Sequence, residues 1–252
     1  MTSLGSNCFQ YCYTLMNIVI PSSVTSLGNS CFRYCYALSS IVIPSSVTSL
    51  DNNCFGYCYT LISAIIPSTV TSLGNSCFSS CRSLTSIVIP PSVISLGDNC
   101  FYGCSALITI VIPSSVTSFG SYCFQNCVST RNLDIPSTVT SLSNSCFSGC
   151  KSLTNIVIPS SVTSLGARCF GYCSALTSVV VPENVTNIQD ECFNGCSGVN
   201  EYHILSSTPP QIDDHTFYGI SSNCIIYVPS GSLAVYKAAS KWSTYASQMV
   251  GE

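Results

Sequence analysis

Nine pairs of cysteines are the residues of this sequence whose type and spacing could carry out chemistry. Each pair has the form Cys-Phe-x-x-Cys, as at Cys31 and Cys35, and Cys224 is left over from a total of 19 cysteines. Thiolates at a fixed spacing could bind a metal ion, form disulfides or act as a redox centre. The role of the cysteines therefore decides whether the protein is an enzyme.

The cysteine spacing fits a metal site poorly. Zinc usually takes thiolates from C-x-x-C motifs with a second pair of ligands at a set distance. Here three residues separate the cysteines, no histidine accompanies the pairs, and the phenylalanine inside each pair indicates apolar surroundings. The sequence therefore predicts no metal site.

Disulfides are the stronger alternative to free thiols. Equivalent cysteines of stacked repeats would lie about 4.8 Å apart, which is within reach of a disulfide. Their Cβ vectors would be parallel, however, so the S–S torsion is unfavourable, and a bridge across one turn is equally strained. An unpaired cysteine behaves as a small hydrophobic residue. We therefore predict two interior columns of free thiols with a structural role.

The two histidines lie late in the chain and provide a second place to look for chemistry. His215 follows Asp213 and Asp214, a grouping that could form a metal site or a catalytic dyad, and His203 stands alone. Because the group follows Pro209 and Pro210, a solvated cluster at the end of the fold is the preferred interpretation. The sequence contains no G-x-S-x-G, Walker A or G-x-G-x-x-G motif. We predict no catalytic residues, no cofactor and no enzyme.

A strict period positions these residues. The prolines that follow one another at steps of 23 residues are Pro21, Pro44, Pro67, Pro90, Pro113, Pro136, Pro159 and Pro182, and the cysteine pairs keep the same step. A period without insertions predicts one coil per repeat, stacked on its neighbours.

Each repeat begins with a strand signal. In "SLTSIVIP", residues 83–90, Ile87 and Ile89 alternate with Val88, which predicts a strand with Val88 on the opposite face. Pro90 lacks an N–H group and ends the strand.

The rest of the repeat predicts the corners of the coil. In "SVISLG", residues 92–97, Val93 and Leu96 should point inward across a bend, and Gly97 should supply a positive φ. "CFYGC" should form a short helical turn, with Phe101 filling the space beneath it.

These motifs resemble the BspA-like, or treponemal-type, leucine-rich repeat, L-x-x-I-x-I-P-x-x-V-x-x-I-G-x-x-A-F-x-x-C. The sequence departs from it by placing Cys where the family usually has Ala before Phe. The resemblance implies a repeat solenoid with 23-residue coils, a parallel β-sheet on the concave face and short helical turns on the convex face. It also implies a surface or secreted protein that engages host proteins or other cells.

The tail departs from the period. We assign 1–200 to a nine-coil solenoid whose first coil is incomplete, and 201–252 to an atypical last repeat and a C-terminal strand–helix cap. Residues 225–228 should form a strand ended by Pro229, and Ser230 or Ser232 should cap a helix that runs to Trp242. Because Met1 stands where the repeats carry Val, we expect that a leader or further repeats precede this segment in a longer natural protein.

Composition excludes two classes of function. Charged residues make up 7% of the chain and the net charge is −3, which argues against nucleic-acid binding. No apolar run approaches the roughly 20 residues of a membrane-spanning helix. Asn184-Val185-Thr186 matches the N-glycosylation pattern, which is weak evidence in a chain rich in Asn, Ser and Thr. We expect a monomer.

Tyrosines recur beside the cysteine pairs of three successive repeats and are the candidate binding residues: Tyr11, Tyr13, Tyr34, Tyr36, Tyr57 and Tyr59. Tyr172 occupies the same position in a later repeat but stands alone. Tyrosine favours contact surfaces because it is large, rigid and amphipathic. The alternative is that the rings only cover the backbone.

Two functions are consistent with these observations. The preferred one is a non-catalytic recognition or adhesion module, extracellular or on the cell surface as the resemblance implies, that binds a host or neighbouring-cell protein or glycan. The alternative is a structural spacer that holds another domain away from the cell envelope.

Overall fold

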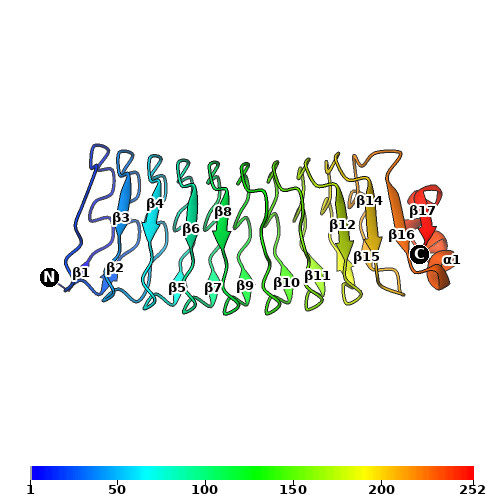
Figure 1. Ribbon diagram of the computed structural model, residues 1–252, viewed down its shortest axis with the longest axis horizontal. Helices are drawn as coiled ribbons and strands as arrows, with labels where there is room; N and C mark the ends of the chain where they lie inside the picture. The colour runs from blue at the N-terminus through cyan, green and yellow to red at the C-terminus, as the bar shows by residue number, and fades with distance from the viewer. Residues whose placement is uncertain (1) are drawn as a thin grey trace.

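Parallel strands, stacked coil upon coil, form the frame of the molecule. The computed structural model describes residues 2–252, and Met1 lies outside the described residues. Figure 1 shows the coils side by side along one straight axis, with the N-terminus at one end and helix α1 (Leu233–Ala238) at the other. The strands lie in two rows along this axis, here called ladder A and ladder B, and each row is divided into three hydrogen-bonded sheets.

Ladder A contains strands predicted from the L-x-x-I-x-I segment, the separately predicted strand at 225–228 and one strand, β17 (Met249–Gly251), that the sequence did not predict. They are β3 (Ser40–Val42), β4 (Ser63–Ile65), β6 (Ser86–Val88), β8 (Thr109–Val111), β12 (Ser178–Val181), β14 (Glu201–Ile204), β16 (Ile225–Val228) and β17. Residues pair with those 23 positions later, as Ser86 does with Thr109. The single bridges Asp134–Val157 and Val157–Val180 continue the ladder into β12. The predicted solenoid of 23-residue coils is confirmed; the assignment of concave and convex faces stays a prediction.

Side chains of ladder A alternate as the sequence indicates. Ile87 and Ile89 are 3% and 2% exposed, whereas Val88 between them is 63% exposed. The strand therefore has one face in the core and one in solvent.

Ladder B lies at the position where the sequence predicted only a bend. Its strands are β1 (Ser3–Leu4), β2 (Ser26–Leu27), β5 (Ser72–Leu73), β7 (Ser95–Leu96), β9 (Ser118–Phe119), β10 (Ser141–Leu142), β11 (Ser164–Leu165), β13 (Asn187–Ile188) and β15 (Gln211–Ile212). Val93 and Leu96 are buried, as predicted. Two residues per strand are too few for alternation to be visible in the sequence.

The prediction of a positive φ at Gly97 is wrong. The positive φ values near this corner belong to Asn99 (55°) and Gly103 (68°). A Cβ atom on Gly97 would lie 2.6 Å from the backbone N of Asn75 and 2.7 Å from the carbonyl C of Gly74. Glycine is therefore required because neighbouring coils approach closely here.

The segment predicted as a helical turn is a run of overlapping four-residue turns. Tyr102 N–H donates to the Asn99 carbonyl at 3.0 Å, and Cys104 N–H to the Phe101 carbonyl at 3.1 Å. The intervening N–H groups of Phe101 and Gly103 donate instead to carbonyls of the next coil, each at 2.8 Å. Because alternate donors leave the coil, no helix forms.

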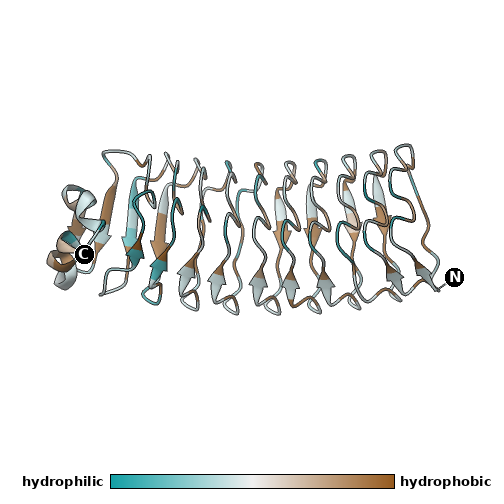
Figure 2. Cartoon of the chain, turned by 180° about the vertical axis from the view of Figure 1, so that it is seen from behind, coloured by the Kyte–Doolittle hydropathy of each residue, from teal (hydrophilic) through white to brown (hydrophobic). Residues whose placement is uncertain are grey.

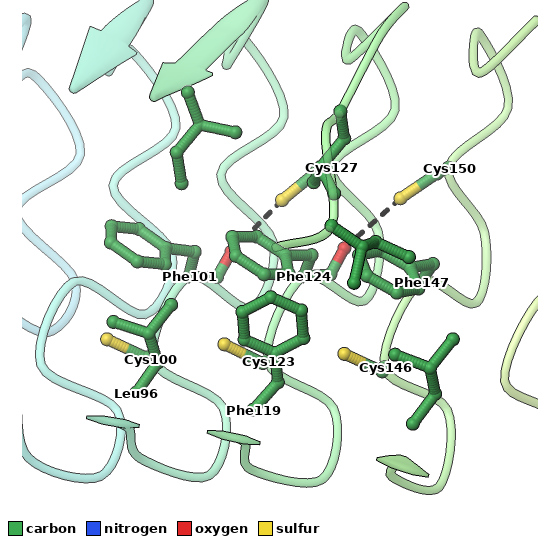
Figure 3. Packing of buried hydrophobic residues seen from close by; sticks show 14 of the residues in the cluster. Leu96, Cys100, Phe101, Phe119, Cys123, Phe124, Cys127, Cys146, Phe147 and Cys150 are labelled. Carbon is green, nitrogen blue, oxygen red and sulfur yellow. Dashed lines mark hydrogen bonds between the residues drawn. The ribbon is translucent and has the colours of Figure 1, made fainter. Parts of the chain in front are cut away.

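Beneath these turns the phenylalanines of the Cys-Phe-x-x-Cys motifs form one column, which is buried from Phe32 to Phe193 and half-buried at Phe9. Phe101, Phe124 and Phe147 stack with centroid separations of 5.5 and 5.6 Å and interplanar angles of 1–2°. Figure 3 shows the three rings in line between the two rows of sulfur atoms.

The C-terminal segment packs against the last strands of ladder A. Strand β16 has the predicted bounds, and Ser232 occupies the N-cap position of α1, although its side chain makes no capping hydrogen bond. The predicted helix does not reach Trp242, because it ends at Ala238 and Lys241 has a φ of 65°. Trp242 begins the 3-10 segment η2 (Trp242–Gln248), which follows α1 and the earlier 3-10 turn η1 (Ser230–Ser232).

Two aromatic side chains attach this segment to the preceding coil. The Tyr236 hydroxyl donates to the Ser206 carbonyl at 2.8 Å, and Trp242 Nε1–H donates to the Pro210 carbonyl at 2.7 Å. No helix within residues 2–252 has the length and apolar character needed to cross a membrane.

Replacing Gly97 by alanine should lower the melting temperature. The added Cβ would meet backbone atoms at 2.6–2.7 Å, and forced overpacking costs about 1–3 kcal/mol. For a chain of this size, each kcal/mol corresponds to about 2–4 °C. Gly231→Ala is the control, because no atom lies within 4 Å of its Cβ position. Thermal unfolding followed by circular dichroism checks this, and equal melting temperatures for the two variants would contradict it.

Candidate functional site

The cysteines form two interior columns, as predicted, from the second repeat onward. The members from Cys31 to Cys196 are buried, and all nineteen cysteines are free thiols. The first pair is the exception, because within residues 2–252 only the following coil packs against it: Cys8 is exposed and Cys12 is half-buried. Within residues 2–252, no group of three or more His, Cys, Asp and Glu side chains is arranged to hold a metal ion.

From Cys35 onward, the second cysteine of each pair has a defined hydrogen-bond partner. Cys127 Sγ donates to the Phe101 carbonyl at 3.2 Å, and Cys150 Sγ donates to the Phe124 carbonyl at 3.3 Å (Figure 3). The same bond recurs from Cys35 to Cys196. Burial raises the pKa of the Cys104 and Cys150 thiols to about 12. Such thiols are neutral at physiological pH and cannot act as nucleophiles.

The two histidines lie in separate surface clusters. His215 Nδ1 lies 3.4 Å from an Asp190 carboxylate oxygen, and Lys241 Nζ lies 3.2 Å from Asp214. The side chains of His215 and Asp214 are 60% and 73% exposed, which confirms a solvated cluster at the end of the fold. His203, in β14, contacts Glu252 at 2.9 Å and stacks on Tyr227.

The six candidate tyrosines come together in two parallel columns, which we call the tyrosine surface. Tyr11, Tyr34 and Tyr57 stack at centroid separations of 5.0 and 4.8 Å. The second column stacks at 5.0 and 4.7 Å and consists of Tyr13, Tyr36 and Tyr59. Within each coil the two rings meet edge to face at 6.0–6.2 Å. Tyr172 lies outside this set.

Two arginines join the tyrosine surface, and sequence reasoning missed both. The Arg33 guanidinium lies 4.7 Å from the Tyr34 ring centroid and 5.4 Å from that of Tyr57. Arg82 lies 4.5 Å from the Tyr59 centroid. The 23-residue period could have identified Arg82, because Arg82 follows Tyr59 by one repeat and therefore occupies the next position in the same column. Within the described chain, neither arginine is in an ion pair.

One tyrosine column occupies a backbone position that disfavours large side chains. Tyr11, Tyr34 and Tyr57 have φ values of 63°, 65° and 63°. In other coils the equivalent position holds Gly103, Gly149, Gly195, Ser80, Asn126 or Tyr172, also at positive φ. A left-handed conformation costs a non-glycine residue about 1–2 kcal/mol. The column is thus placed where the fold alone favours glycine or asparagine.

Comparison with known families assigns the chain. The model of the family described as "BspA type leucine-rich repeat region" matches residues 2–131 and 117–239. The chain therefore belongs to this family. No curated protein matches it.

Solved structures show the same fold. A leucine-rich repeat protein from Bacteroides ovatus is 26% identical with a TM-score of 0.78; the match covers 90% of this chain and 58% of that protein. The Treponema pallidum leucine-rich repeat protein is 28% identical with a TM-score of 0.61, covering 64% and 78%. A leucine-rich cell surface protein from Faecalibacterium prausnitzii is 26% identical with a TM-score of 0.55, covering 95% and 79%. The chain thus spans little more than half the length of the Bacteroides ovatus protein.

Alkylation of the native protein at pH 8 should modify only Cys8 and Cys12. The other thiols are buried, and those with a raised pKa have negligible thiolate at this pH. Intact-mass measurement after iodoacetamide treatment checks this. Denaturation without reductant should expose all nineteen groups, and a shortfall would reveal disulfides.

Replacing a tyrosine at positive φ by asparagine should distinguish two contributions to stability: the cost of the left-handed backbone and the gain from ring stacking. Tyr172→Asn should stabilise the protein by about 1 kcal/mol, because it relieves left-handed strain without removing a tyrosine stack. Tyr34→Asn should give no gain, because it also removes two stacked contacts worth about 0.5–1.5 kcal/mol each. Urea unfolding midpoints measure both effects. Equal stabilisation by both variants would mean that stacking contributes nothing.

Proposed function

We propose that this protein is a non-catalytic recognition module, extracellular or on the cell surface, that contacts a protein or glycan partner through the tyrosine surface. Membership of a repeat family supports an interaction module, since stacked repeats offer a broad, rigid surface. The name of the Faecalibacterium prausnitzii structure, a cell surface protein, supports the location.

The observation that carries the proposal is the backbone strain beneath the tyrosines. Tyr11, Tyr34 and Tyr57 hold a left-handed conformation at three successive coils, although Gly103 or Asn126 fills the same position without that cost. Strain of this kind concentrates at functional sites. Because Tyr172 holds the same conformation alone, the first three coils are set apart by the stacked rings on this backbone, and the stacked column supports a role in binding.

The stacking determines what a partner would meet. Because the ring faces cover one another at 4.7–5.0 Å, a partner contacts ring edges and hydroxyl groups rather than open ring faces. Phenol hydroxyls both donate and accept hydrogen bonds. Arg33 and Arg82 add positive charge without an ion-pair partner among residues 2–252. This combination suits a polar partner that carries carboxylate or sulfate groups.

A structural spacer is the second candidate. A straight stack of coils with backbone bonds between neighbours is a rigid rod (Figure 1), and the tyrosine rings would then serve only to shield the backbone. The two candidates differ in whether removing the rings changes binding.

Binding to a glycan and extracellular-matrix array should depend on the tyrosine surface. The variant Tyr34→Ser/Tyr36→Ser/Tyr57→Ser should lose at least about tenfold in affinity for any partner found, because buried tyrosines dominate contact energies. The matched control Tyr122→Ser/Tyr172→Ser/Tyr218→Ser removes three exposed tyrosines elsewhere and should bind normally. Normal binding by the first variant would show that the tyrosine surface is not the binding site and would favour the structural spacer.

A further inference from the structure

From the first coil to β12, the solvent face of ladder A carries a row of β-branched aliphatic side chains that Asp134 interrupts. His203 of β14 and Tyr227 of β16 continue the same row toward the C-terminus. Figure 2 shows brown, hydrophobic segments along these strands. The residues of this row, which we call the valine row, are Val19, Val42, Ile65, Val88, Val111, Asp134, Val157 and Val180. Apart from the aspartate, they are 43–90% exposed. A contiguous apolar surface of this kind marks an interaction site.

A second row runs beside the valine row, three residues earlier in each coil. Its members are Met16, Ser39, Ile62, Thr85, Ile108, Arg131, Thr154 and Thr177. Met16, Ile62 and Ile108 are 64%, 54% and 50% exposed. Within the coils from Val19 to Val180, Arg131 and Asp134 are the charged members of the two rows, and both are exposed. Titratable residues return on the next coil of this face, at Glu201 and His203. Among residues 2–252 neither side chain takes part in an ion pair.

The geometry points to a second copy of this chain as the occupant of this face. Consider two copies related by a two-fold axis parallel to the solenoid's long axis, with their ladder A faces together. Each coil then opposes the same coil of the second copy with its strands antiparallel, so the valine row meets the second row. Arg131 meets Asp134 of the second copy twice, as an isologous contact requires.

A two-fold axis parallel to the strands fits the charges of this face less well. An axis parallel to the strands and through the coil of Arg131 preserves position along each strand. It would therefore place Arg131 on Arg131 and Asp134 on Asp134, and like charges in an interface are repulsive. Charge complementarity thus selects one arrangement, in which coils of the same number lie opposite each other.

The size of the face sets the strength of the association. Eight coils at roughly 4.8 Å each and four residues at roughly 3.3 Å each give an area of roughly 500 Å² per copy. Both copies together bury roughly 1,000 Å², which is the lower end of specific interfaces. We therefore infer a reversible dimer at micromolar or higher concentrations, in place of the monomer expected from the sequence.

Charge exchange tests this dimer directly. Sedimentation velocity of the wild-type chain over a range of concentrations should show a monomer–dimer equilibrium. Arg131→Asp and Asp134→Arg should each raise the dissociation constant at least tenfold, because each places like charges opposite one another. The double variant Arg131→Asp/Asp134→Arg should restore it to within about threefold, since the pairs re-form with reversed sign. Lys151→Asp, an exposed charge outside both rows, is the matched control and should dimerise normally.

Each outcome decides the question. A wild-type chain that stays monomeric at about 0.5 mM would overturn the proposal, because that concentration populates even weak dimers. If both single variants still dimerise, or if the double variant does not, then ladder A is not the interface and Arg131 does not pair with Asp134 of the second copy. The substitutions lie on the surface in the sixth coil, away from the tyrosine surface in the first three, so binding on the array and dimerisation can fail independently. Circular dichroism confirms that each variant is folded.

Discussion

Every feature of this solenoid depends on the hydrogen bonds by which each coil's backbone binds the next. In the turns, alternate N–H groups close a local turn, while those between them donate to the following coil, as Phe101 does to Cys123 at 2.8 Å. This arrangement forces a fixed register of 23 residues. The one change of register, to 24 residues at Glu201–Ile225 and Asn187–Gln211, accompanies the loop that contains Ser206 and Pro210. Tyr236 and Trp242 of the C-terminal segment satisfy the carbonyls of that loop.

The same register explains why the interior carries sulfur. The Phe101 carbonyl accepts the N–H of Cys104 and, from the next coil, the thiol of Cys127. From Cys35 onward, the second cysteine of each pair therefore has a bonding role that alanine cannot fill. The first cysteine, for example Cys123, donates no such hydrogen bond and fills a small apolar space. This is the position at which the family usually has alanine, so the departure from the family pattern leaves the fold unchanged.

The sequence predicts whatever depends on period and side-chain polarity. The alternation at Ile87, Val88 and Ile89 correctly predicted the strands of ladder A. The repeat spacing of the six tyrosines was sufficient to predict that they lie together. Backbone conformation was harder to predict, because Gly97 serves a close approach of coils while Asn99 and Gly103 hold the positive φ values. The contacts of Arg33 and Arg82 with tyrosine rings depend on side-chain direction, which a one-residue-per-repeat pattern does not specify.

Burial of the interior leaves only the outward positions free to vary, and two groups of them depart from a plain polar surface. The tyrosines lie in the first three coils, and the valine row runs along ladder A. In the dimer inferred above, the two-fold axis keeps coils of the same number opposite each other. Both tyrosine surfaces then lie at the same end of the pair. A partner with repeated groups would meet two sites held close together, and its apparent affinity would rise through effective concentration without any new contact. Weak self-association and weak recognition would thereby reinforce each other in one rigid assembly.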